Sequence, residues 1–131
     1  MLDRIDMHVE ITPIYYEEMT SEKLTESSET IRKRVIKAVG MQKKRFAGTV
    51  NTYSNASMSS QMVKEICQLD LASQQLLKSA MDNLQLSARA YDRILKLART
   101  IADLSQSNQI ELAHVAEAIT YRNLDRENWA G

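Results

Sequence analysis

The sequence predicts an all-α fold, a helical bundle of about five helices preceded by one stray strand. Three observations support this class. The 131 residues include only 3 glycines, 1 proline and 5% aromatic residues, which disfavours a turn-rich β-sandwich or barrel. After residue 30, apolar residues recur at helical spacing. Serine or aspartate stands at the start of several periodic segments, where helices take their N-caps.

The first expected element is a strand at residues 7–12. Its apolar residues alternate with polar ones, and Pro13 ends the run. One strand without a partner leaves its backbone polar groups unpaired. We therefore expect either pairing with another chain or, as the favoured alternative, a sheet that belongs to a larger protein. Residues 19–30, which are rich in Ser, Thr and Glu, are typical of a flexible linker.

The first helix is expected over residues 31–46, with Ser28 as a candidate cap. One side of this helix is apolar and is expected to face the core: Ile31, Val35, Ala38, Val39, Gln42 and Phe46. Gly40 lies inside the helix, where glycine costs about 1 kcal/mol relative to alanine. A bend or a frayed turn is therefore expected at Gly40, and a loop of small polar residues follows at 49–57.

Four more helices complete the predicted bundle. Ser59 or Ser60 begins a short one, Asp70 caps the next, Ser87 caps the longest, and the last follows residues 105–108. Their core-facing residues are expected to be Met62, Val63, Ile66, Leu76, Leu77, Ala80, Met81, Leu84, Tyr91, Ile94, Leu95, Ala98, Ile101, Ala102, Leu112, Val115, Ala116 and Ile119.

Composition excludes several classes of function. The 17 Lys and Arg residues balance 17 Asp and Glu residues, so no global field draws the chain to nucleic acid or to an anionic membrane. Cys67 is the single cysteine and is expected to be an inert core thiol, and with 2 histidines it cannot build a Cys/His zinc site, so no metal site is expected. No apolar run approaches the roughly 20 residues that span a bilayer. We expect a soluble cytoplasmic protein without a membrane partner.

Two groups of basic residues are candidate binding sites. Arg89, Arg93 and Lys96 lie on one ridge of the helix that Ser87 caps, and Arg89 lies in the first turn, where an anion would also meet free backbone N–H groups. A second group on the helix at 31–46 includes Lys33, Lys37 and Lys44, which are opposite its apolar side. This second group is either a solvated helix face or a contact with DNA phosphates.

Four segments carry a family resemblance. They are the segment Leu2–Glu10, which includes Asp3-Arg4-Ile5-Asp6; the pattern Arg34-Val35…Gln42…Arg45-Phe46 with Asn55-Ala56; the stretch Leu86–Leu104 (LSARAYDRILKLARTIADL); and the ending His114…Glu117-Ala118-Ile119…Tyr121-Arg122…Leu124-Asp125-Arg126. Together they resemble the C-terminal part of magnesium-chelatase-like AAA+ ATPases, and within that family the bacterial ComM/YifB branch, which is tied to DNA handling. The stretch Leu86–Leu104 is the most specific of the four.

The resemblance implies a division of the chain and two roles for arginines. Residues 1–18 would end the ATPase core, 19–30 would be the linker, 31–126 the C-terminal helical lid domain and 127–131 a tail. Arg4 would be the arginine finger that reaches ATP on the neighbouring subunit. Arg89 would be the sensor-2 arginine on the γ-phosphate, with Arg93 in support.

The resemblance further implies partners that this chain does not contain. ATP and its Mg²⁺ would be held by an ATPase core, which would assemble into a ring, expected to be a hexamer, and DNA would be the substrate. Gly40 and Gly48 are the only internal glycines and no P-loop motif is present, so this chain alone is expected to be inactive. Val39-Gly40 stands where relatives usually have Ala-Arg. The alternatives are a DNA-binding helical module or, ranked last, the ATPase subunit of a metal chelatase.

Overall fold

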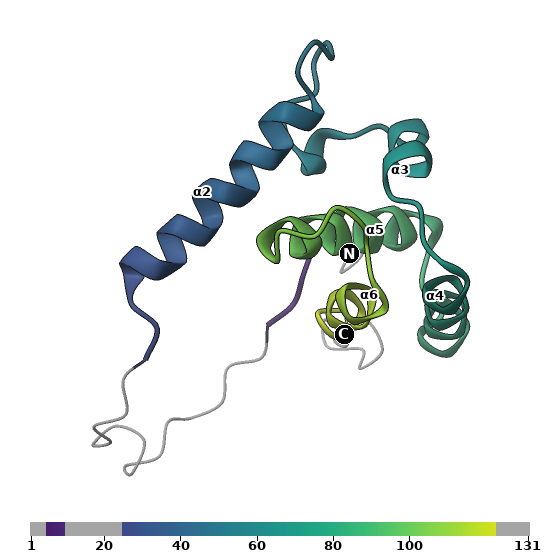
Figure 1. Ribbon diagram of the computed structural model, residues 1–131. Coiled ribbons are helices and arrows are strands. Elements are labelled where there is room, and N and C mark those ends of the chain that lie inside the picture. Colours follow the sequence, from purple (N-terminus) through teal and green to yellow (C-terminus); the bar gives the residue numbers. More distant parts are fainter. Residues whose placement is uncertain (1–4, 10–24, 123–131) are drawn as a thin grey trace.

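The computed structural model describes residues 5–9 and 25–122, and the described residues form an all-helical fold (Figure 1). Within these ranges the chain has five α-helices, one short 3-10 helix and no strand. In order they are α2 (Ser28–Arg45), η2 (Asn55–Ser57), α3 (Ser60–Ile66), α4 (Leu71–Leu84), α5 (Ala88–Leu104) and α6 (Leu112–Thr120). The predicted all-α class and the number of helices are confirmed for this part of the chain.

Short polar side chains begin four of the helices, largely as predicted. The side chains of Ser59, Asp70 and Ser87 each accept a hydrogen bond from the backbone N–H three residues later, at 2.8–3.2 Å. Such a bond satisfies one of the free donors in the first turn. The cap of α2 is Ser27 and not Ser28, because Ser27 Oγ accepts from Thr30 N–H at 3.1 Å. The helix therefore starts three residues earlier than predicted.

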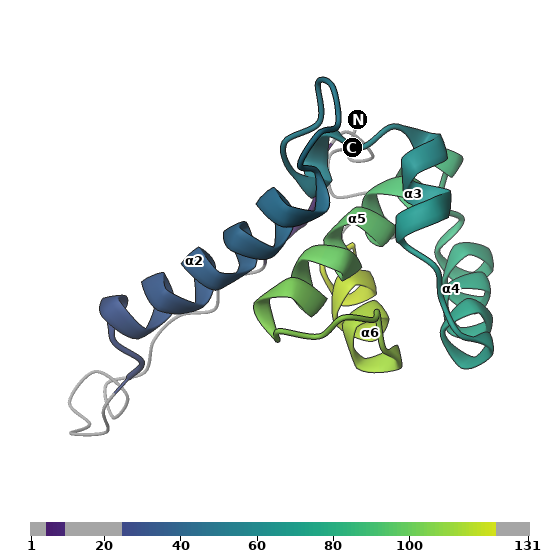
Figure 2. The same cartoon turned by 45° about the horizontal axis from the view of Figure 1, so that its top comes forward.

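Helix α5 is the central element, and the others surround it (Figures 1 and 2). It packs against α2, η2, α3 and α6, while α4 packs against α6. The core between these helices is formed by Phe46, Met58, Val63, Cys67, Leu77, Ile94, Leu95, Ala98, Ala102, Ile110, Val115 and Ala118. Among the described residues, no helix is long and apolar enough to cross a membrane.

Helix α2 differs most from its prediction. Ile31, Val35 and Val39 were expected in the core but keep 42–44% of their surface exposed, and within α2 only Ala38 is buried. Figure 2 shows the reason: the N-terminal half of α2 projects away from the other helices, and only its C-terminal end reaches α5. The helix also runs unbroken through Gly40, so the predicted frayed turn is absent.

Two further expectations are corrected. The strand predicted at 7–12 is absent from its described part, residues 7–9, and residues 10–12 lie outside the described ranges. No strand of the described chain is available for pairing, and His8 N–H instead donates to the carbonyl oxygen of Tyr121, just after α6. On α6, Leu112 is 44% exposed, while Val115 and Ala118 provide the buried face.

Candidate functional site

A charged cavity of about 280 Å³ lies along the N-terminal half of α5. Arg89, Asp92, Arg93 and Lys96 occupy successive turns of one side of this helix, so their side chains reach the same space. The complete lining is Asp6, Ala56, Arg89, Asp92, Arg93, Lys96, Leu97 and Thr100. The cavity therefore combines three cationic and two carboxylate side chains with Ala56, Leu97 and Thr100.

The three cations are not equally available to a ligand. Arg93 Nη1 pairs with the carboxylate of Asp6, and Lys96 Nζ donates to the carbonyl oxygen of Ala56 at 3.2 Å. Arg89 is exposed and makes no hydrogen bond or ion pair within the described part of the chain. Its guanidinium can therefore bind a ligand without first breaking a protein contact.

The two carboxylates are both engaged. Asp6 pairs with Arg93, and Asp92 accepts a hydrogen bond from Ser60 Oγ at 2.7 Å. Asp92 and Lys96 are four residues apart on α5 but form no ion pair, and Lys96 Nζ donates to the Ala56 carbonyl oxygen instead. The three cations exceed the two carboxylates by one, so the cavity keeps an excess of positive charge.

This arrangement suits an anion of the size of a phosphate group. The exposed guanidinium of Arg89 has all of its donors free of partners among the described residues. A guanidinium can donate two parallel hydrogen bonds to phosphate oxygens, which favours this ligand class. Pockets that enclose a whole small molecule usually measure about 300–1,000 Å³, so this cavity would hold one end of a larger ligand.

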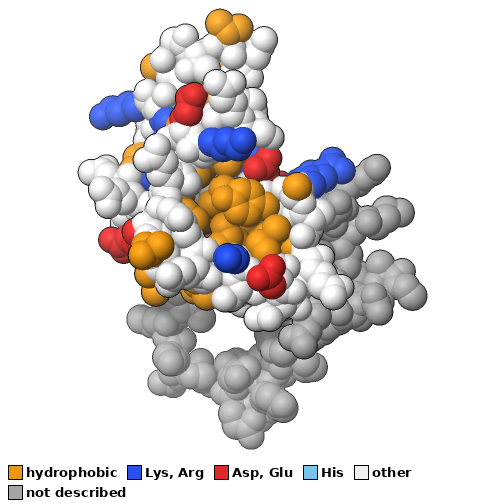
Figure 3. Space-filling model, turned by 90° about the vertical axis from the view of Figure 1, so that its right-hand side faces the viewer, with side chains coloured by type: hydrophobic (Ala, Val, Ile, Leu, Met, Phe, Trp, Pro, Cys, Tyr) orange, Lys and Arg blue, Asp and Glu red, His pale blue; other side chains and the backbone are white. Residues whose placement is uncertain are grey.

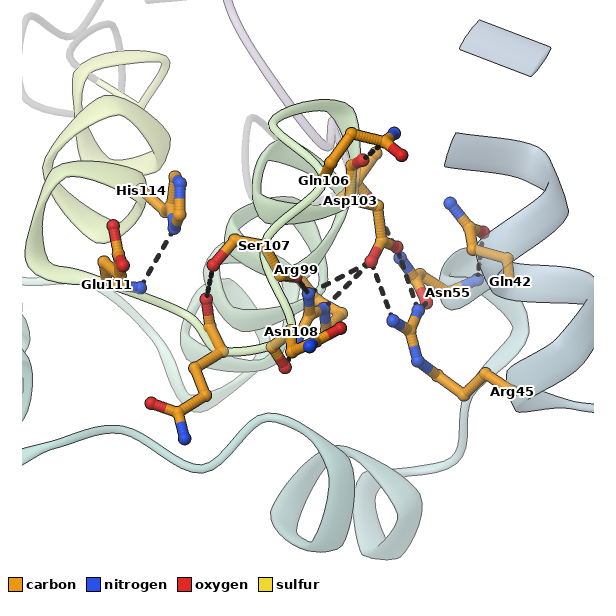
Figure 4. Close-up of polar contacts among 12 residues, drawn as sticks. Gln42, Arg45, Asn55, Arg99, Asp103, Gln106, Ser107, Asn108, Glu111 and His114 are labelled. Atoms are coloured by element: carbon orange, nitrogen blue, oxygen red, sulfur yellow. Dashed lines mark hydrogen bonds and ion pairs between the residues drawn. The ribbon is translucent and has the colours of Figure 1, made fainter. Parts of the chain in front are cut away.

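A buried polar network fixes the opposite end of α5 and the loop that walls the cavity (Figure 4). Arg45, at the end of α2, donates to both carboxylate oxygens of Asp103, at 2.9 and 2.7 Å. Asn55 donates to Asp103 at 2.9 Å and to Thr100 Oγ1 at 3.1 Å. Since Thr100 and the neighbour of Asn55, Ala56, both line the cavity, this network positions its wall.

Arg99 completes the network from within α5. Its Nε and Nη2 lie 3.2 and 3.1 Å from Asp103 Oδ1, and it donates to the carbonyl oxygens of Ser107 and Asn108 at 2.6 and 3.1 Å. The loop between α5 and α6 is therefore tied to α5. The contacts of Arg45 join α2 to α5, and those of Arg99 with Ser107 and Asn108 join α5 to the loop that follows it, so the role of the network is structural.

The charges of the network are set by burial and by its hydrogen bonds. Burial alone would raise the pKa of the Asp103 carboxyl, but the bonds from Arg45 and Asn55 and the two positive charges outweigh it, and the pKa is lowered. Burial also lowers the pKa of Arg99, although Asp103 opposes that shift. Burial raises the pKa of the Cys67 thiol to about 11, so this thiol stays protonated near neutral pH.

The sequence interpretation missed this network. Arg45 lies in one turn with two other cations, and Arg99 and Asp103 have the four-residue spacing of an ordinary surface pair, so neither pattern predicts a buried network. One signal was present: Arg99 and Asp103 follow the core residue Leu95 at intervals of four, so all three lie on one face of α5. A salt bridge on a buried helix face needs additional partners, and the sequence offered Arg45 and Asn55.

The predicted site residues fall into three groups. Arg89 and Arg93 meet at the cavity, as their position on one helix predicted. Arg4 lies outside the described residues. Lys33, Lys37 and Lys44 are exposed on α2, and Lys33 Nζ lies 3.4 Å from Glu29 Oε1. Within residues 5–9 and 25–122, no group of three His, Cys, Asp or Glu side chains is placed to hold a metal ion.

A second hollow has a different character. Hydrophobic side chains gather at the centre of the face that α3 and α4 present (Figure 3). Beside α4 an open groove of about 500 Å³ is lined largely by the apolar side chains of Leu69, Leu71, Leu77, Met81 and Tyr91. Tyr91, expected in the core, forms one wall of this groove and is 39% exposed. The groove holds no cluster of charged groups comparable with the cavity on α5.

Comparison with known proteins places the chain in a family. Residues 25–122 match the family model described as magnesium chelatase, subunit ChlI C-terminal. The chain belongs to this family. The matched range coincides with the larger described part, so the helices around α5 are the fold of a ChlI C-terminal domain.

Curated relatives agree with the ChlI assignment. The chain is 38% identical to YifB of Escherichia coli and 39% identical to the competence protein ComM of Haemophilus influenzae, each over 127 residues. YifB of Salmonella typhimurium is 37% identical over the same length. Each alignment covers 95% of this chain and 24% of the relative. The chain therefore spans about a quarter of the length of these relatives, and the resemblance to magnesium-chelatase-like proteins of the ComM/YifB branch is confirmed.

Proposed function

We propose that this chain is the lid of an oligomeric, cytoplasmic AAA+ ATPase of the ComM/YifB type, in which ATP hydrolysis drives DNA remodelling. In this role Arg89 is the sensor-2 arginine that contacts the γ-phosphate, and Arg4 is the arginine finger that reaches ATP on a neighbouring subunit of a hexamer. The observation that carries the proposal is the exposed guanidinium of Arg89, which makes no hydrogen bond or ion pair within the described residues and borders a cavity of about 280 Å³ with an excess of positive side chains.

The residues present fit the end of a triphosphate. Arg89 would hold the terminal phosphate, with Arg93 beside it in support, and the remaining nucleotide and its Mg²⁺ would be bound by an ATPase core that this chain does not include. Bound ATP supplies a phosphoryl group whose charge grows as it is transferred, and an arginine finger accelerates such transfer by about 10³–10⁵-fold. The task of this chain is to bring arginines to that charge and to exclude water around it.

Variants of the full-length ring protein test these roles. Arg4→Ala is expected to lower the turnover of ATP by roughly 10³-fold or more while ATP still binds. Arg89→Ala is expected to weaken the preference for ATP over ADP, and Arg89→Lys to restore it only in part, because lysine lacks the bidentate geometry. Arg32→Ala, which removes an exposed guanidinium from α2, is the matched control, measured without DNA. Unchanged turnover in Arg4→Ala or unchanged nucleotide preference in Arg89→Ala would reject the corresponding role.

A second function, DNA-phosphate binding, is favoured by the charge of α2. The helix carries one acidic residue, Glu29, and the exposed side chains of Lys33, Lys37 and Lys44. Each phosphate contact contributes about 0.9 to the slope of log K against log salt. Replacing the three lysines with glutamine should therefore reduce that slope by up to about 3, whereas glutamine at Lys64 and Lys78 should not. If the triple variant binds duplex DNA with the same affinity and salt dependence as the unmodified chain, α2 is rejected as the contact with DNA.

A further inference from the structure

The segment at residues 5–9 lies far from the helices in sequence but is attached to them in space. Arg93, on α5, pairs with the carboxylate of Asp6 across 87 positions of sequence. Arg122, just after α6, donates from Nη1 to the carbonyl oxygen of Ile5. Two guanidinium groups from different parts of the helical domain thus bind two consecutive residues of this segment.

Backbone contact and burial support the attachment. His8 N–H donates to the carbonyl oxygen of Tyr121, and the His8 side chain is itself buried. Arg122 is fully buried, so its guanidinium is surrounded by the protein and not by water. A buried guanidinium requires hydrogen-bond acceptors, and the Ile5 carbonyl provides one of them.

The attached segment enters the candidate site. Asp6 is one of the residues that line the cavity containing Arg89, and it reaches this cavity through its pair with Arg93. The side chain of Arg93 is only 22% exposed, whereas that of Asp6 is 64% exposed. The helical domain therefore provides the more buried half of the contact, and the segment provides the more exposed half.

We propose that Arg93 and Arg122 are positioning residues that clamp residues 5 and 6, which directly follow Arg4 in the sequence, onto the helical domain that carries Arg89. This inference deepens the proposed function and rests on it for the role of Arg4. It assigns Arg93 to the segment and leaves Arg89 to meet the phosphate. A movement of α5 would then carry residues 5 and 6 along with Arg89. In the proposed function, this couples the lid to the chain that follows the arginine finger.

Hydrogen exchange of the His8 amide tests the clamp in this chain. Asp6→Asn and Arg93→Gln are each expected to speed that exchange roughly 2–5-fold, as the loss of a partly exposed ion pair does. Arg122→Gln should have a larger effect, about tenfold or more, because a buried charged donor is lost. The exchange of the Leu77 amide in α4 reports global unfolding and should not follow the first two variants.

Two further variants make the result specific. The double variant Asp6→Arg with Arg93→Asp, which swaps the two charges, should restore slow hydrogen exchange of the His8 amide. Arg89→Gln removes a positive charge from the same cavity without touching Asp6, and it should leave that exchange unchanged. The clamp is overturned if His8 exchanges at the rate of an unstructured amide in the unmodified chain, or if Asp6→Asn and Arg93→Gln exchange like the unmodified chain.

A readout in the full-length ring protein separates this inference from the proposed function. Arg93→Gln is expected to lower kcat for ATP while the KM stays unchanged, and the double variant Asp6→Arg with Arg93→Asp should restore kcat. If Arg4→Ala retains full turnover, the finger role fails while the His8 exchange still decides the clamp. If His8 exchange is insensitive to Asp6 and Arg93 while Arg4→Ala is inactive, the clamp fails and the finger role stands.

Discussion

Replacing Asp103 with asparagine removes the negative charge that Arg45 and Arg99 share. Asp103 has no exposed surface, and the side chains of Arg45 and Arg99 are 17% and 4% exposed, so neither guanidinium can turn to water in compensation. Breaking a buried ion pair by removing one partner costs about 3–5 kcal/mol. This is a large share of the about 5–15 kcal/mol that stabilises a typical domain, so we expect Asp103→Asn to approach the unfolding threshold.

Urea unfolding at pH 7, followed by circular dichroism, measures this loss as a shift of the midpoint at constant slope. The matched control is Glu26→Gln, which breaks the pair of Arg34 with Glu26 on the solvent side of α2, where both side chains are more than 40% exposed. This variant should unfold almost like the unmodified chain. A loss below about 1 kcal/mol in Asp103→Asn, the range of surface pairs, would refute the reasoning that the network fastens α2 to α5.

Three other predictions follow from burial and backbone geometry. The folded pKa of Asp103 lies below its unfolded value near 3.9. The ionised carboxylate therefore stabilises the fold fully above about pH 4, and this contribution is lost as the pH falls through the folded pKa. The difference in unfolding free energy between the unmodified chain and Asp103→Asn should shrink in acid. A Cβ at Gly40 would meet nothing within 4 Å, so Gly40→Ala should raise the unfolding free energy by up to about 1 kcal/mol; a lower melting temperature would contradict this. The Cys67 thiol is buried, with a pKa near 11, and should resist iodoacetamide at pH 8 until urea unfolds the chain; rapid labelling of the folded chain would contradict this.

Local features of the sequence predicted most of the helix starts. Ser59, Asp70 and Ser87 satisfy N–H groups only three residues away, so their role depends little on the rest of the fold. The core face of α5 was also largely predicted, because its apolar residues repeat regularly and the helix is surrounded by others. Arg89 and Arg93 were placed together correctly for the same reason, since one helix carries both.

Features that depend on distant partners were not predicted. The apolar side of α2 has the same periodicity as a buried helix, but periodicity does not reveal whether a neighbour covers it, and Ile31, Val35 and Val39 remain exposed. The contact of Asp6 with Arg93 spans 87 positions and that of Arg45 with Asp103 spans 58. No local pattern specifies such pairs, and Arg45 resembled its exposed neighbours Lys43 and Lys44 because all three are cations in one turn.

The attachment of α2 by one end gives the helix a stability that varies along its length. At its C-terminal end the backbone is held by Arg45 and Phe46, which are anchored in the domain, so opening there requires the network to break. Within the part of the chain that the structure describes, the side-chain contacts at its N-terminal end are the Ser27 cap and the pairs of Glu26 and Glu29 with α2 side chains. A short helix without tertiary support is marginally stable in water. Successive turns of α2 should therefore unwind from Ser28 inward, and the helix can lengthen or shorten at that end without disturbing the cavity on α5.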